Sequence, residues 1–121
     1  MQSNTYDLSG KRVFVAGHKG MVGSALLQRE DCEILTADHA YVDLIDPDQV
    51  GALLRGGRPH AVFVAAAKVG GILANATYPA DFLYNNLMIE ANVIHQSFKA
   101  NVETLVFLGS SCIYPKFAPQ P

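Results

Sequence analysis

Three glycines at regular spacing, Gly17, Gly20 and Gly23, form the pattern in this chain that most directly suggests chemistry. An apolar run, 12–16, precedes them, and a segment with helical spacing follows at once. A glycine turn between a strand and a helix is the setting in which dinucleotides are bound. The first glycine allows a tight turn, the middle one lets backbone approach a pyrophosphate, and the last lets helix and strand pack closely. The alternative is a turn that only connects the two elements.

Charged residues in and after this loop bear on which nicotinamide cofactor it would hold. Lys19 could reach a phosphate as a point charge, or be an ordinary solvated lysine. Asp38 follows the second apolar run, where an acidic side chain binds the ribose diol of NAD and a cation favours the 2′-phosphate of NADP. His39 lies there too, and His18 is expected to support the loop rather than to catalyse. Lys19 thus favours NADP and Asp38 favours NAD, so both cofactors stay open.

Short apolar runs that alternate with helical patterns must position these residues. We expect strands at 12–16, 33–36, 61–65 and 104–108. Helices are expected at 21–30, from the capping residue Asp46 to the glycines at 56–57, and from Pro79 to about Lys99. This alternation predicts an α/β fold, a Rossmann-type parallel sheet with helices on both faces. In the first helix, one apolar face is expected from Val22, Ala25 and Leu26. In the last helix, an apolar stripe interpreted as core is formed by Leu83, Leu87, Ala91, Ile94 and Phe98.

Composition places these elements in one domain and excludes several classes of function. The chain has 121 residues, of which 50% are hydrophobic and 17% charged, so a packed core is expected for 11–121 and a flexible arm for 1–10. A net charge of −2 argues against nucleic acid as a partner. The longest apolar run, 61–67, is far below the roughly 20 residues that span a membrane. Two cysteines indicate a cytoplasmic setting, and no spacing of His, Cys and Asp suggests a metal site.

The glycine loop and three further stretches resemble the extended short-chain dehydrogenase/reductase superfamily. Residues 43–46 are similar to its acidic element beside the adenine, 64–66 to the small-residue turn that passes the ribose and phosphates, and 109–111 to its catalytic serine segment. The cofactor-binding residues that this resemblance implies are Gly17, His18, Lys19, Gly20, Met21, Val22, Gly23, Asp38, His39, Asp43, Leu44, Ala65, Ala66, Ala67, Leu108 and Gly109.

Longer strings, at 15–24, 65–72 together with 75–82, and 107–116, are similar to one family within it, the bacterial GDP-L-fucose synthases. That resemblance implies a nucleotide-sugar substrate, GDP-4-keto-6-deoxy-D-mannose, which is epimerised at C3 and C5 and reduced at C4 by NADPH. Ser110 matches the serine that hydrogen-bonds the substrate carbonyl, and Cys112 the cysteine that transfers a proton in the epimerisation. Both could instead be simple loop residues. His39 stands where the family has an arginine for the 2′-phosphate, which keeps NAD as an alternative cofactor.

The superfamily also needs a tyrosine followed four residues later by a lysine. None of the five tyrosines, Tyr6, Tyr41, Tyr78, Tyr84 and Tyr114, has one. The resemblance therefore implies the first part of a longer enzyme, cut after about the fifth strand, without the substrate domain and inactive alone. A dinucleotide-binding module without turnover, or part of another NAD-dependent nucleotide-sugar epimerase or dehydratase, remains open. The parent would be a homodimer through helix 79–99, whereas the oligomeric state of this chain stays open.

Overall fold

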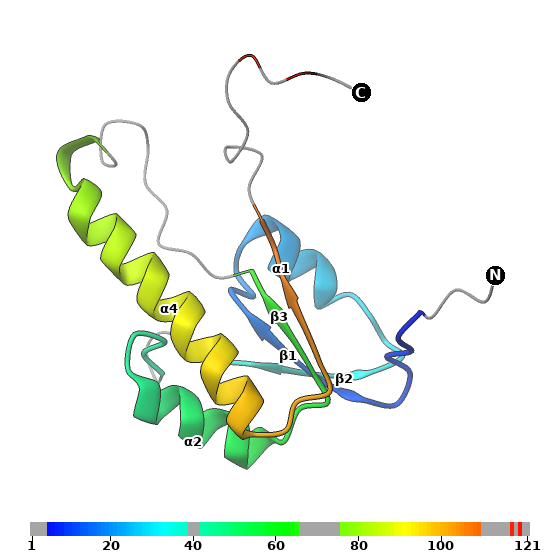
Figure 1. Ribbon diagram of the computed structural model, residues 1–121. Helices are drawn as coiled ribbons and strands as arrows, with labels where there is room; N and C mark the ends of the chain where they lie inside the picture. The colour runs from blue at the N-terminus through cyan, green and yellow to red at the C-terminus, as the bar shows by residue number, and fades with distance from the viewer. Residues whose placement is uncertain (1–4, 39–41, 66–75, 110–116, 118, 120–121) are drawn as a thin grey trace.

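In the described part of the chain, four short strands, all parallel, form one sheet (Figure 1). The computed structural model describes residues 5–38, 42–65, 76–109, 117 and 119. The strands are β1 (Arg12–Ala16), β2 (Glu33–Thr36), β3 (Ala61–Val64) and β4 (Thr104–Phe107), in the order β2-β1-β3-β4. The predicted strands and the parallel sheet are thus confirmed, each strand to within one residue. Among the described residues β4 is the fourth strand, where the resemblance counted a fifth.

Helices cover both faces of this sheet, as predicted. They are α1 (Met21–Leu26), α2 (Pro47–Gly57) and α4 (Pro79–Lys99). In Figure 1, α2 and α4 lie together on one face of the sheet and α1 lies on the other. Side chains alternate between the faces along each central strand because successive residues of a strand point to opposite sides. Phe14 and Val62 therefore face α2 and α4, whereas Val13 and Ala61 face the layer that contains Leu26.

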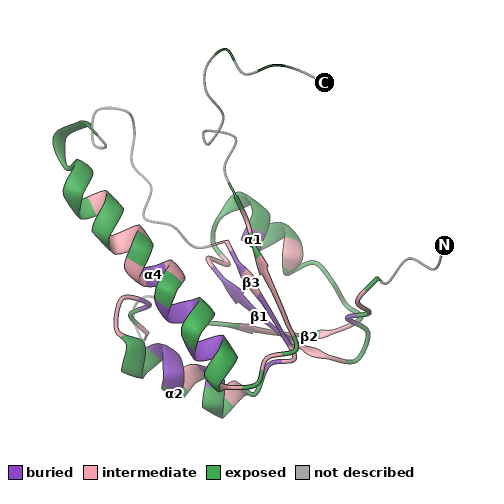
Figure 2. Ribbon diagram, in the orientation of Figure 1, coloured by how far each residue is buried: buried purple, intermediate pink, exposed green. Residues whose placement is uncertain are grey.

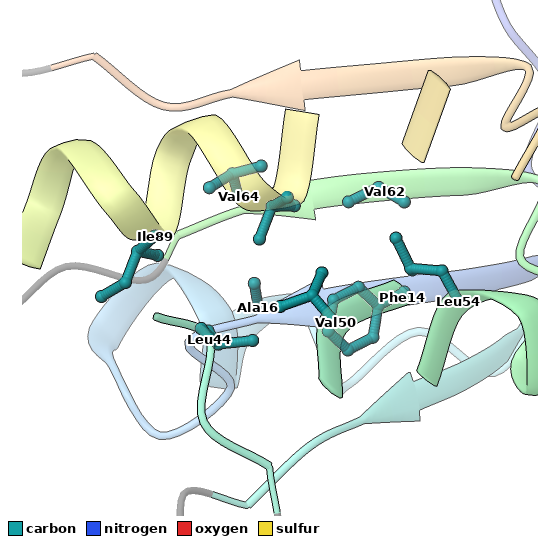
Figure 3. Close-up of a cluster of buried hydrophobic side chains, with 9 residues drawn as sticks. Phe14, Ala16, Leu44, Val50, Leu54, Val62, Val64 and Ile89 are labelled. Carbon is teal, nitrogen blue, oxygen red and sulfur yellow. The ribbon is translucent and has the colours of Figure 1, made fainter. Parts of the chain in front are cut away.

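The larger core lies between the sheet and the pair α2 and α4 (Figure 3). Phe14 and Leu54 are each 1% exposed, and their side chains point toward one another in the close-up. The buried members of this core come from β1, β3, both helices and the segment before α2: Phe14, Ala16, Leu44, Val50, Leu54, Val62, Val64, Ile89 and Val93. Burying a large apolar side chain stabilises a fold by about 1.5–3 kcal/mol. This cluster therefore fixes the ends of β1 and β3 relative to α2 and α4.

Local signals at the start of α2 behave as the sequence predicts. Asp46 is the N-cap, and its carboxylate accepts from the backbone N–H of Asp48 at 2.9 Å and of Gln49 at 3.4 Å. Pro47 occupies the first helical position, where its missing N–H is harmless. The end of α2 differs slightly, because the left-handed residue that closes it is Arg58, at φ 46°, rather than a glycine.

The bounds of α4 are confirmed, but the prediction of its core-facing side is wrong. Leu83, Leu87 and Ile94 of the predicted stripe are 62%, 54% and 46% exposed, and Phe98 is 80% exposed. Ile89, Asn92, Val93, Gln96 and Ser97 are buried instead. Figure 2 shows the exposed side running along the helix. The buried side carries polar residues because Asn92 binds the segment before α2, so hydrophobicity alone selects the wrong face.

Two further predictions differ from the structure near the N-terminus. Helix α1 ends at Leu26 instead of near residue 30, because the next N–H groups bond to carbonyls three residues back, Gln28 to Ala25 and Arg29 to Leu26. Of its predicted stripe, Val22 is 43% exposed and Ala25 is exposed, so only Leu26 packs against the smaller core. Within the segment expected to be a flexible arm, Leu8 is buried in the smaller core.

Candidate functional site

The carboxyl ends of β1 and β3 lie next to one another at one edge of the sheet, because the two strands pair in parallel. From β1 the chain moves outward to β2, and then returns across β1 to form β3 on its other side. Such a reversal of strand order is the switch point at which open parallel sheets bind ligands, beyond the carboxyl ends of the strands. The loop after β1 and Ala65, the first residue after β3, both lie at this edge, where the N–H of Ala65 bonds to the carbonyl of Ala16.

Each of the three glycines after β1 has its own steric situation. Gly17 has φ +86°, a left-handed backbone conformation that residues with a side chain rarely adopt. Glycine at this position therefore allows the tight turn after β1. A Cβ on Gly23 would lie 2.0 Å from the carbonyl oxygen of Gly17, so only glycine allows α1 to pack this closely on the loop. A Cβ on Gly20 would meet only that same oxygen, at an ordinary 3.5 Å. Among the described residues, no contact thus requires a glycine at position 20.

Lys19 and Asp38 form an ion pair that joins the glycine loop to the end of β2. The Lys19 ammonium nitrogen lies 2.8 Å from Oδ2 of Asp38, and their side chains are 66% and 40% exposed. The sequence offered the two residues as opposing indications of cofactor choice, and the structure brings them together. The pair partly neutralises each charge at the edge where a ribose or its 2′-phosphate would lie.

The segment after β2 is held by side chains from α2 and α4. Gln49 accepts from the backbone N–H of Asp43 at 2.9 Å and donates to Oδ2 of Asp46 at 3.0 Å. The Nδ2 of Asn92 donates to the carbonyls of Leu44 and Ile45, at 3.0 and 2.8 Å. Leu44 is 4% exposed, so its side chain belongs to the core and only its backbone is available to a ligand.

Asn92 is the positioning residue that the sequence prediction missed. Its signal was its place one position before Val93 and three after Ile89, on the side of α4 with fewer apolar residues. A buried asparagine is expected to have hydrogen-bond partners, and a loop with free carbonyls supplies them. The exposed Asp43 carboxylate accepts from the N–H of Ile45 at 3.0 Å, which completes the turn.

The remaining predicted residues are placed in part. The N–H of Ala65 donates to the carbonyl of Ala16 at 2.9 Å, and that of Leu108 to the carbonyl of Val64 at 3.2 Å. Both residues therefore continue the sheet into the candidate edge, with Gly109 next to them. His18 is half-buried, whereas Met21 is 87% exposed beside the loop. The predicted residues that lie outside the described part of the chain are His39, Ala66, Ala67, Ser110 and Cys112.

The described ranges contain neither a candidate metal cluster nor a candidate membrane span. Within them, no three side chains of the His, Cys, Asp and Glu types gather in a way that would hold a metal ion. Within the same ranges, no helix has both the length and the apolar character needed to cross a membrane.

Comparison with known proteins agrees with the geometry at this edge. Residues 13–121 match the model of the NAD dependent epimerase/dehydratase family. The chain is 60% identical over 119 residues to a GDP-L-fucose synthase of Sinorhizobium fredii, covering 96% of this chain and 38% of that protein. It is 52% identical over 118 residues to the GDP-L-fucose synthase of Escherichia coli, covering 94% and 37%. The chain thus spans little more than a third of the length of these relatives.

A solved structure with a similar fold carries a bound nucleotide. It is MlghC, described as a GDP-mannoheptose C4 reductase from Campylobacter jejuni with NADP bound. The TM-score is 0.85 at 36% sequence identity, and the match covers 97% of this chain and 38% of that one.

Proposed function

Because this chain belongs to the NAD dependent epimerase/dehydratase family, we propose that its glycine loop binds the pyrophosphate of a nicotinamide dinucleotide. The observation that carries this proposal is the contrast among the three glycines. Gly17 and Gly23 are required by the turn and by the packing of α1, but Gly20 meets no steric demand from the described protein atoms. Its missing side chain leaves room for a pyrophosphate to approach the backbone.

We propose NADP as the cofactor, with NAD as the alternative. Relatives support NADP, since MlghC was solved with it bound. Lys19 supplies a cation at the end of the loop, but its partner Asp38 would repel a 2′-phosphate unless cations outweigh it. The described residues fit either dinucleotide, so the balance between Lys19 and Asp38 decides the preference. When bound, NADPH would supply the hydride for a reduction.

The reaction we propose is that of the GDP-L-fucose synthases, to which the chain is 60% and 52% identical in two bacteria. The substrate would be GDP-4-keto-6-deoxy-D-mannose, with epimerisation at C3 and C5 and reduction at C4. Ser110 would donate a hydrogen bond to the C4 carbonyl, and Cys112 would move a proton at the epimerised carbons. A thiol suits that role when its surroundings bring its pKa near the working pH. The proposal keeps a cytoplasmic setting for the whole enzyme.

A second candidate remains, another GDP-sugar reductase of the same family. MlghC supports it, because that protein is 36% identical to this chain and is described as a reductase of a different GDP-sugar, GDP-mannoheptose. Both candidates share the cofactor site and differ in the substrate. A third, a module that binds the dinucleotide without turnover, follows from the missing Tyr-x-x-x-Lys pair in these 121 residues.

Calorimetric titration with NADPH and NADH tests cofactor binding. Gly20→Val should abolish the binding heat, because a branched side chain occupies the space left for the pyrophosphate. Gly56→Val is the matched control, since a Cβ there meets nothing within 4 Å on a helix away from the loop. Equal heats from the native chain and Gly20→Val would refute the site.

The same titration tests cofactor choice. Asp38→Asn removes a negative charge beside the proposed 2′-phosphate, so it should strengthen NADPH binding relative to NADH. Asp31→Asn, which removes a carboxylate paired with Arg29 instead, should leave the ratio unchanged. Tighter binding of NADH than of NADPH by the native chain at low salt would contradict the preference for NADP.

Absorbance at 340 nm, followed with NADPH and GDP-4-keto-6-deoxymannose, tests turnover. We expect the 121 residues to stay near background, because general acid catalysis contributes about 10²–10⁴-fold and positioning about 7–11 kcal/mol. The sequence has no tyrosine followed four residues later by a lysine, the pair that would supply general acid catalysis. Turnover within tenfold of the roughly 10 s⁻¹ typical of enzymes would show that the catalytic residues are misassigned.

A further inference from the structure

A cavity lies at the opposite edge of the sheet from the glycine loop. Its volume is about 450 Å³. The strands contribute residues at or just before their amino ends, Arg12, His60 and Glu103, whereas the glycine loop follows the carboxyl end of β1. The last turns of α2 and α4 form the rest of the wall, and in Figure 1 these two helix ends lie side by side at that end of the sheet. The proposed cofactor site does not include this cavity.

Four cationic side chains line the cavity: Arg12, Arg55, Arg58 and Lys99. The whole chain has nine lysines and arginines and a net charge of −2, so nearly half of its cations gather here. Glu103 is the carboxylate among the lining residues. Within the described ranges, no carboxylate forms an ion pair with Arg55, Arg58 or Lys99.

Helix ends explain part of this charge but not all of it. The carboxyl ends of α2 and α4 each carry roughly half a negative charge, which favours cations nearby. The two helix ends offset about one of the four positive charges, and Glu103, which is paired with Lys11, offsets at most one more. An excess of about +2 to +3 therefore remains around the cavity.

The backbone holds one of these arginines in a conformation that glycine adopts more readily. Arg58 has φ 46° and ψ 55°, at the position where helices commonly end in glycine. Its carbonyl accepts from Nε of Arg12 at 2.9 Å, which fixes the Arg12 guanidinium at the cavity. His60 adds a donor, because its Nδ1 accepts from the N–H of Arg12 at 2.9 Å and its Nε2 therefore carries the hydrogen when neutral.

We propose that this cavity binds the phosphate group of a small phosphorylated compound. A phosphate monoester carries about −1.5 to −2 charges at pH 7, which matches the excess positive charge. Guanidinium groups bind phosphate oxygens through two parallel hydrogen bonds, so three arginines can share one group. The volume lies within the range of about 300–1,000 Å³ for small-molecule sites, which leaves space for the rest of the molecule. This inference is independent of the proposed cofactor site.

Nuclear magnetic resonance titration of the ¹⁵N-labelled chain tests it, with glycerol 3-phosphate and inorganic phosphate as probes at constant ionic strength. We expect dose-dependent shifts of the Nε–H signals of Arg12, Arg55 and Arg58 and of nearby backbone amides. Dimethyl phosphate, a monoanion, should bind at least tenfold more weakly. Shifts with glycerol 3-phosphate but not with inorganic phosphate would assign the site to organic esters, and shifts with both would assign it to the phosphate group alone. Both results support the proposal.

Matched variants identify the residues responsible. Arg55→Gln and Lys99→Gln are exposed helix positions, and each should raise the dissociation constant about five- to tenfold by removing a charge-assisted hydrogen bond. Arg29→Gln, an exposed arginine paired with Asp31 away from the cavity, should leave it unchanged. Sodium chloride producing the same shifts, signals moving only at the glycine loop, or Arg29→Gln weakening binding equally would overturn the proposal. A native-like amide spectrum for each variant separates loss of binding from loss of fold.

Discussion

Gly23 and Gly20 lie three residues apart in one loop, yet the protein needs them for different reasons. A Cβ on Gly23 would lie 2.0 Å from a backbone oxygen, which cannot move aside without shifting the loop or α1. A Cβ on Gly20 would make an ordinary contact at 3.5 Å. Gly23 is thus required by the fold, whereas Gly20, on our proposal, is required by the ligand.

Alanine at each position separates these roles. Gly23→Ala should destabilise the chain by about 1–3 kcal/mol, the usual cost of overpacking, and should weaken dinucleotide binding as well. Gly20→Ala should leave stability within about 0.5 kcal/mol and weaken binding alone. Urea unfolding followed by circular dichroism gives the first quantity and NADPH titration the second. Equal stability of the two variants would show that the steric account of Gly23 is wrong.

At the scale of elements, α4 owes its orientation to an asparagine rather than to its most apolar side. Asn92 is 7% exposed and donates to the carbonyls of Leu44 and Ile45, which lie within the 43–46 segment that the resemblance predicts to lie beside the adenine. Removing the amide would leave two carbonyls without this donor in a partly or fully buried place. An unpaired buried polar group costs about 1–3 kcal/mol.

Asn92→Ala should therefore lower the free energy of unfolding by about 2–4 kcal/mol, from the two lost bonds and the small cavity. Asn85→Ala, a partly exposed asparagine of the same helix, should change it by less than about 0.5 kcal/mol. Urea denaturation measures both. A loss in Asn92→Ala no larger than in Asn85→Ala would mean that α4 does not hold the 43–46 segment.

Local signals made the elements predictable, but long-range contacts decided how they face one another. The cap at Asp46, the proline at position 47 and the β-rich runs act over a few residues, so the bounds of α2 and of the strands follow from the sequence. Asn92 meets Leu44 across 48 residues, and Lys19 meets Asp38 across 19. Spacing along a helix cannot reveal such partners. The glycine loop was predictable because its requirements lie within seven residues.

At the scale of the whole molecule, the exposed stripe of α4 gives the chain an apolar surface. Leu83, Leu87 and Ile94 continue toward Phe98, and Phe107 at the end of β4 is 45% exposed. Contiguous apolar surface of this kind favours association. Pairing of the parent enzyme through this helix stays a prediction of the resemblance.

We expect this chain to self-associate in a concentration-dependent way. Leu87→Lys and Phe98→Lys should each shift the equilibrium toward monomer, because a charge replaces buried apolar contact. Met21→Lys, which alters an exposed apolar residue outside the stripe, should have little effect. Sedimentation equilibrium measures the shift. A monomer at all concentrations, in the native chain, would contradict the prediction.

The N-terminal segment is tied to the far edge of the sheet by a clasp of Tyr6, Lys11 and Glu103. The hydroxyl of Tyr6 donates to Glu103 at 2.5 Å, the Lys11 ammonium lies 3.2 Å from the same carboxylate oxygen, and Lys11 also lies over the Tyr6 ring at 4.0 Å. The hydrogen bond from Tyr6, followed by that from Lys11, holds the pKa of Glu103 below its ordinary value.

Stability should therefore depend on the ionisation of Glu103 in acid. Because the pKa of Glu103 is lower in the folded chain than in the unfolded chain, its carboxylate stabilises the fold at pH values above the unfolded-state pKa. This stabilisation is lost as the pH falls through the folded-state pKa, from about pH 5 downward. Glu103→Gln should flatten this part of the stability profile, measured by urea unfolding at each pH. Glu30→Gln, an exposed glutamate away from the clasp, serves as control. A native profile that Glu103→Gln leaves unchanged would show that the clasp contributes nothing.

The same clasp has a consequence for the order of events in folding. Tyr6 and Glu103 are 97 residues apart, so their bond closes nearly the whole chain into one loop. Contacts between residues so far apart in the sequence form late, because the chain loses the entropy of loop closure before the contact can stabilise it. The bond should therefore be absent from the folding transition state and slow only the reverse process. Tyr6→Phe should raise the unfolding rate in stopped-flow experiments and leave the folding rate unchanged, so the clasp acts as a kinetic barrier to opening; a slower folding rate would place it in the nucleus instead.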